Sequence, residues 1–144
     1  MSTTIDTAEI LRIATDYLDT APANRFRGDV ASEWVERRIF ATPLLGVAAA
    51  GDPLFAGLKA PEAVGPHSAL PTDWLPAARS VVSLFLPFTA EVCVSNIPDA
   101  EWPSWPWLYG RIEGQACVND LLHHAAQVLR QRGAKVVAPS LDDR

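Results

Sequence analysis

A long amphipathic stretch between two short apolar segments constrains the fold of this chain more than any other feature of its sequence. From Leu108 to Arg132, apolar residues recur at steps of three and four, which is typical of a helix with one buried face. Gly133 follows, at a position where many helices end in a left-handed residue. Residues 80–87 and 135–138, on either side of this helix, are rich in valine and are predicted strands.

This strand, helix, strand order predicts a crossover unit. Such connections are right-handed and join parallel strands, so strands 80–87 and 135–138 are expected to run parallel. The apolar character of residues 80–87 predicts a central place in the sheet, and Pro87 ends the strand because it cannot donate to a ladder. The predicted fold class is α/β, a single compact domain with a small mixed, partly parallel sheet flanked by helices.

The N-terminal half predicts further elements of the same domain. Residues 7–20 form an N-terminal helical segment, and residues 40–144 form the core of a single α/β domain spanning 1–144. A buried strand is expected at 44–50, and Asp52 and Pro53 are typical of the start of a short helix. Prolines make residues 60–76 and 96–107 irregular loops, and a weak pattern suggests a short helix at 33–38.

The length and the net charge of the chain limit the classes of protein to which it can belong. A chain of 144 residues corresponds to about one domain. It carries 12 Lys and Arg against 17 Asp and Glu, a net charge of −5, so general nucleic-acid binding is not expected. The apolar runs are too short to span a membrane. The polar start from Met1 to Glu9 is unlike a secretory signal, and a cytoplasmic location is expected.

The two cysteines, Cys93 and Cys117, are too few for an iron-sulfur cubane, which takes four thiolates. They are far apart in the sequence and are expected to be buried, reduced thiols. His123 and His124 are adjacent on the predicted helix, so their side chains point about 100° apart and are poorly placed to share one ion. We expect no metal site and no cofactor in this chain.

Motifs for nucleotide binding and nucleophilic catalysis are missing from the sequence. It contains no Gly-x-Gly-x-x-Gly, no Gly-x-x-x-x-Gly-Lys and no Gly-x-Ser-x-Gly. Gly110 and Gly114 are better explained as positions where another element packs closely on the helix. The carboxylates available for acid or base chemistry are better explained as solvated or capping groups: Asp73, Glu101, Glu113 and Asp120. Catalytic and cofactor-binding residues therefore stay unassigned.

A tryptophan-rich passage is the candidate interaction surface. It combines stiff proline backbone with large apolar area, which either packs on its own domain or binds a partner. Arg111 also has the chemistry to face an anionic ligand, although a surface arginine is the simpler interpretation. The candidate interface residues are Trp102, Trp105, Trp107, Tyr109 and Arg111.

Four ordered passages carry a resemblance to a known family. They are Pro43 to Phe55, Asp73 to Phe88, Tyr109 to Ala116 and Gly133 to Pro139. Together they resemble the front domain of epoxyqueuosine reductase and its iron-sulfur relatives, and they are most similar to the reductase-like ferredoxin proteins. The resemblance implies an α/β front domain followed by a ferredoxin-like cluster domain, which this sequence lacks. In the tRNA-modifying enzyme, a cobalamin lies between the two domains.

The resemblance implies a function for this chain as the substrate- or cofactor-facing front domain of such a redox protein. We expect no redox turnover from it alone. Two alternatives stay open: a protein-interaction module that self-associates or docks a separate chain, and a small-molecule or corrinoid-binding domain. The expected partners are accordingly a second copy of the chain or a cluster-bearing chain.

Overall fold

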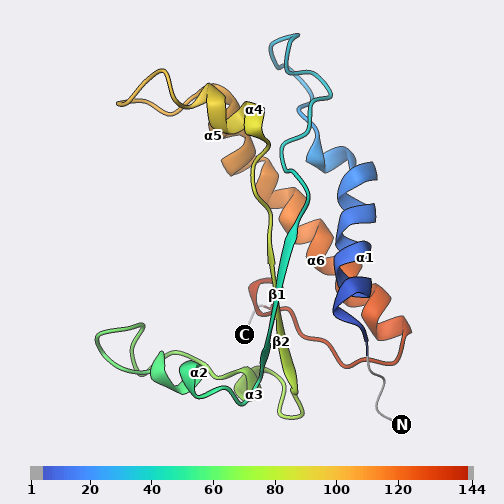
Figure 1. Ribbon diagram of the computed structural model, residues 1–144, viewed down its shortest axis with the longest axis vertical. Coiled ribbons are helices and arrows are strands. Elements are labelled where there is room, and N and C mark those ends of the chain that lie inside the picture. The colour runs from blue at the N-terminus through green and yellow to red at the C-terminus, as the bar shows by residue number, and fades with distance from the viewer. Residues whose placement is uncertain (1–4, 143–144) are drawn as a thin grey trace.

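The computed structural model describes residues 5–142 as a mixed helix and sheet protein (Figure 1). Its strands are β1 (Leu44–Ala49) and β2 (Ser80–Phe85), and its helices are α1 (Thr7–Thr20), α2 (Pro53–Gly57), α3 (Pro71–Trp74), α4 (Ala90–Ser95), α5 (Trp105–Ile112) and α6 (Gly114–Gln131). Single 3-10 turns lie at Pro22–Asn24 and Pro139–Leu141.

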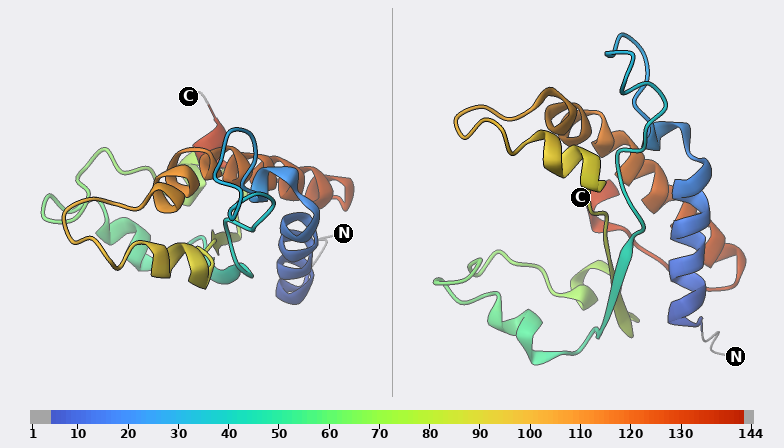
Figure 2. Two further views of the ribbon diagram at one scale, coloured as in Figure 1. Left: turned by 90° about the horizontal axis from the view of Figure 1, so that it is seen from above. Right: turned by 45° about the horizontal axis from the view of Figure 1, so that its top comes forward.

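Helix α1 has the bounds that its sequence pattern predicts. The Asp6 carboxylate accepts a hydrogen bond from the Ala8 backbone N–H and so caps its first turn. Its apolar stripe is buried, with Ala14 and Leu18 fully covered. The stripe packs beside α6, as Figures 1 and 2 show, and an ion pair between Glu9 and Arg132 joins the ends of the two helices.

The single helix predicted over 108–132 is two helices, α5 and α6, that meet at Glu113. The Ser104 hydroxyl accepts from the Trp107 N–H, so α5 begins inside the passage that was predicted to be a loop. Gly110 and Gly114 lie on either side of Glu113. A Cβ at Gly110 would come within 2.7 Å of the Phe88 ring. The prediction that these glycines permit close packing is therefore confirmed.

The sheet is an antiparallel pair, and the predicted parallel component is absent from the described residues. In its register Leu44 lies opposite Phe85 and Ala49 lies opposite Ser80. The predicted third strand, 135–138, is irregular and is not paired with β2. Its Val136 carbonyl instead accepts a hydrogen bond from the Arg130 side chain at 2.8 Å. Strand β2 is therefore half of a two-stranded sheet and not a central strand.

Local capping also produces short helices, one inside a passage that was predicted to be a loop and one in a segment for which no element was predicted. Helix α3 begins at Pro71 within the first proline-rich passage, and α4 begins after Thr89, whose hydroxyl accepts from the Val92 N–H. The Asp52 carboxylate caps α2 as predicted, by accepting from the Leu54 N–H at 2.9 Å. In place of the suggested helix at 33–38, residues 33–36 form turns and Arg38 makes an isolated antiparallel bridge with Arg25.

The hydrophobic core is formed by residues of α1, α4 and α6 and by the segment between α1 and β1. It contains Ala14, Leu18, Phe26, Ile39, Phe40, Val92, Cys117 and Leu121. The fully buried Asn24 holds this core together, because its side-chain amide donates to the Leu18 and Phe40 carbonyls and accepts from the Phe40 N–H. The β1–β2 hairpin runs away from this core toward α2 and α3.

Candidate functional site

Two of the predicted interface residues are exposed tryptophans, and they differ in how far they are exposed. Trp102 is 73% exposed in the loop before α5, while Trp105 is 44% exposed at its start. Trp105 also packs on Phe26 and Tyr109, with ring centroids 6.1 and 5.4 Å away. Part of the Trp105 side chain therefore packs on its own domain, and Trp102 is the more accessible of the two to a partner.

Trp107 and Tyr109 are half-buried structural residues. The Trp107 ring meets Phe88 edge-on at 6.3 Å. The Tyr109 hydroxyl donates to the Arg27 carbonyl at 3.1 Å and accepts from the Arg27 N–H. These two hydrogen bonds fix the backbone at Arg27 to α5. Arg111 is exposed in the last turn of α5. The passage thus packs mainly on its own domain.

The hairpin has an exposed apolar face that the sequence analysis did not single out. Neither β1 nor β2 contains a charged residue, and both faces of the pair carry apolar side chains. Such strands are typical of sheets that are covered on both sides. Yet Leu44 and Phe85, which lie opposite each other, are 61% and 62% exposed. We call the face that carries this pair the hairpin face.

Sequence reasoning missed the hairpin face because it assigned these strands to the interior of a larger sheet. In Figures 1 and 2, α1 and α6 lie to one side of the hairpin, and the short helices lie toward its two ends. The sequence carried one signal of it, because neither of the segments that form β1 and β2 contains a charged residue.

An apolar cavity of about 570 Å³ runs along β2. Helix α6 contributes Leu122, Ala125 and Leu129 to its wall, and α2 and α3 contribute Phe55 and Trp74. The irregular segment 135–140 closes one side. Its volume lies within the range of small-molecule pockets, which are mostly apolar with a few polar groups.

The two cysteines have different surroundings, and neither belongs to a cluster of ligands. Both are free thiols; Cys117 is buried as expected, whereas Cys93 is exposed, contrary to the prediction. Burial, with a smaller effect from Asp120, raises the pKa of the Cys117 thiol to about 11. A thiol held in its protonated form is a poor nucleophile and a poor metal ligand.

The adjacent histidines diverge, as the helix geometry predicts. The His124 ring stacks on Tyr17 with centroids 4.9 Å apart. Burial is the main cause that raises the pKa of the Tyr17 hydroxyl, with Asp120 and Cys117 adding to it. His123 lines a different cavity, at the C-terminal end of the chain.

Among residues 5–142, no three His, Cys, Asp or Glu side chains gather in a group that could hold a metal ion. An iron-sulfur cluster does not fit the two separated thiols. Over the same range, none of the helices combines the length and the apolar character needed to cross a membrane. Comparison of the chain with protein-family models, curated proteins and solved structures gives no match.

Proposed function

We propose that this chain is the front domain of an epoxyqueuosine reductase-like redox protein, and that a cluster-bearing domain or chain covers its hairpin face. The family in this proposal rests on the resemblance of the four sequence passages, and the docking face rests on one observation: Leu44 and Phe85 are paired and exposed on a sheet without charged residues. Exposure of an apolar sheet face to water is unfavourable in free energy, and a partner that covers the face removes this exposure.

The two cysteines of this chain indicate which protein would supply the ligands of the cluster. The chain contains two cysteines, one exposed and one in the core, so the four thiolates of a cubane would come from the partner. The isolated chain is expected to be colourless and free of iron after anaerobic reconstitution with iron and sulfide. Stoichiometric iron with visible absorption would contradict this part of the proposal.

Capture from the native cell extract tests the docking surface. The wild-type chain is expected to retain a partner that brings iron and acid-labile sulfide, and the double variant Leu44→Ser, Phe85→Ser is expected to lose both. Leu54→Ser with Ile97→Ser is the matched control, because these side chains are also exposed but lie outside the strands. Retention of a partner without iron, or equal capture by both double variants, would overturn the proposal.

Self-association is the competing occupant of the same surface. Light scattering of the purified chain at high concentration distinguishes the two. A stable dimer that the Leu44→Ser, Phe85→Ser variant abolishes would replace the cluster-bearing partner with a second copy of the chain. A monomer is the expected result.

The apolar cavity along β2 supports a second candidate function, the binding of a small apolar molecule. Ala125 is buried on α6 and lines this cavity, so Ala125→Leu is expected to fill part of it. An apolar fluorescent dye should bind the wild type and bind Ala125→Leu more weakly. Hydroxocobalamin should give no spectral change; a saturable change would favour the corrinoid alternative.

A further inference from the structure

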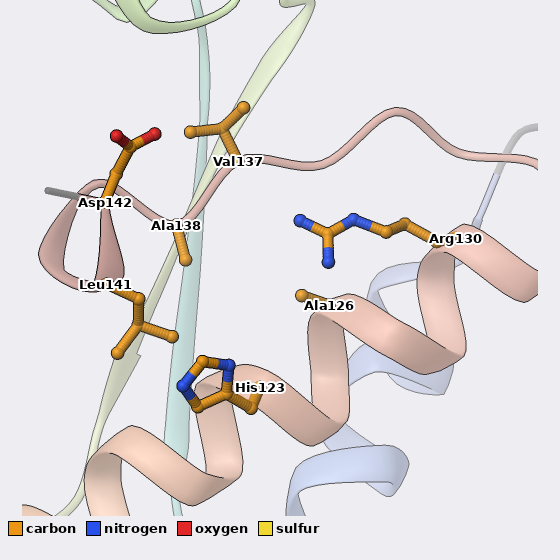
Figure 3. A pocket seen from close by; sticks show the side chains of 7 residues that line it. All are labelled: His123, Ala126, Arg130, Val137, Ala138, Leu141 and Asp142. Atoms are coloured by element: carbon orange, nitrogen blue, oxygen red, sulfur yellow. The ribbon is translucent and has the colours of Figure 1, made fainter. Parts of the chain in front are cut away.

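A second cavity, of about 560 Å³, lies between α6 and the C-terminal segment (Figure 3). It is lined by His123, Ala126, Arg130, Val137, Ala138, Leu141 and Asp142. Neither Leu44 nor Phe85 belongs to it, so an inference about this cavity does not rest on the proposed function.

Two nitrogen-bearing side chains converge on this cavity. His123 and Arg130 are seven residues apart on α6 and therefore lie on the same face of the helix, about two turns from each other. Figure 3 shows the imidazole and the guanidinium both pointing into the space between α6 and the C-terminal segment. Ala126 lies between them, and its small side chain leaves the space over that face open.

The guanidinium is held in place while keeping donors for a ligand. Arg130 Nη2 donates to the Val136 carbonyl at 2.8 Å, which ties the side chain to the segment across the cavity. A guanidinium has five N–H donors, so this bond leaves most of them for another acceptor. An imidazole offers a ring N–H donor in either neutral tautomer. Together these groups can bind an oxyanion.

The other walls indicate the size, charge and polarity of that ligand. Val137, Ala138 and Leu141 are apolar and line the cavity from the C-terminal segment. Asp142 also lines it, with its carboxylate turned away from His123 in Figure 3. This nearby negative charge, and the negative end of the α6 dipole, favour a monoanion over a dianion.

We propose that this cavity binds a small organic carboxylate. Its oxygens accept from Arg130 and His123, and its short apolar body packs against Val137 and Leu141. Charge-assisted hydrogen bonds from arginine to a carboxylate supply most of the binding energy, and the apolar walls select acids that carry a hydrocarbon chain.

Isotope-edited NMR of the full chain tests this site with sodium butanoate as the probe and sodium chloride at matched ionic strength as the reference. Signals of the His123 ring and the Arg130 side chain are expected to shift saturably. Arg130→Gln should weaken the binding of butanoate at least about tenfold, because it removes one charge-assisted hydrogen bond. Arg111, exposed like Arg130, lies on α5 and does not line the cavity, so Arg111→Gln removes the same charge elsewhere and should leave affinity unchanged.

A second variant keeps the test informative if Arg130→Gln disturbs the fold by releasing Val136. Leu141→Ser retains both nitrogen-bearing side chains and should weaken butanoate while leaving acetate, which has almost no apolar body, unaffected. Shifts that do not saturate, equal weakening by Arg111→Gln and Arg130→Gln, or sulfate binding as tight as butanoate binding would overturn the proposal.

Discussion

Leu44 and Phe85 are direct cross-strand neighbours, and each leaves about three-fifths of its side chain exposed on the hairpin face. The opposite face of the same strands behaves differently, because Leu84 packs against the core. Val47 and Val82, cross-strand neighbours on that opposite face, are 49% and 39% exposed, so only its Leu84 end packs on the core. The hairpin face is where we expect a partner to bind.

Substitution on the two faces should separate stability from binding. Leu44→Ser with Phe85→Ser is expected to change the free energy of unfolding by less than about 1 kcal/mol, because both side chains are already largely in water. Leu84→Ser should cost about 2 kcal/mol or more, since it removes packing from the core. Urea denaturation measures both. A large loss in the double variant would show that the hairpin face is covered within the chain itself.

Gly114→Ala is expected to destabilise the fold. The new Cβ would lie 2.8 Å from Cζ of Phe40, a buried ring that stacks on Phe88 at 5.4 Å and has little room to move. Overpacking of this kind costs about 1–3 kcal/mol. Gly57→Ala is the matched control, because a Cβ there meets nothing within 4 Å. Equal thermal stability of the two variants would show that the contact between α6 and Phe40 is looser than described.

Asn24→Ala should be among the most damaging polar substitutions in the chain. It removes three side-chain hydrogen bonds from a fully buried site and leaves the Phe40 N–H without its acceptor. The expected loss is about 2–4 kcal/mol in the free energy of unfolding. Asn119→Ala, which removes a single bond to Gln115 on α6, should cost about 0.5 kcal/mol. Chemical denaturation of both variants tests the difference.

The two thiols should differ sharply in reactivity. At pH 8 a thiol-specific reagent is expected to modify exposed Cys93 and to spare Cys117, whose pKa of about 11 leaves roughly one thiolate per thousand molecules. Cys93→Ser should therefore react only when the protein unfolds. Rapid modification of that variant under native conditions would contradict the burial of Cys117.

The same raised pKa of Cys117 predicts that the stability of the fold decreases as the pH rises. The folded protein holds the thiol proton more tightly than the unfolded chain, whose reference value is 9.0. Its contribution to stability is therefore present below about pH 9 and is lost as the pH rises toward about 11. Cys117→Ala should lack this part of the alkaline decline, which melting curves between pH 8 and 11 would reveal.

Local chemistry was sufficient to predict α1, the start of α2 and the positions of β1 and β2, but the strand predicted at 135–138 was wrong. An acidic cap and a stripe of apolar residues define α1, and Asp52 and Pro53 define the start of α2, because all of these interactions lie within one or two turns. The cap at Gly133 was predicted for the same reason, and its φ of 87° confirms the left-handed conformation. The division of residues 105–131 into two helices was not predicted, because it depends on aromatic rings from Phe40 and Phe88.

The sequence by itself determined α1, the start of α2, two of the three predicted strands, and that two cysteines cannot hold a cubane. Only the tertiary structure decided that Val136 is tied to Arg130 and not to β2, that Leu44 and Phe85 face outward, and that His123 and Arg130 share a cavity. Strand pairing and side-chain exposure depend on contacts between residues far apart in the chain. Apolar periodicity reports which residues prefer burial, whereas the packing of the whole domain decides which of them achieve it.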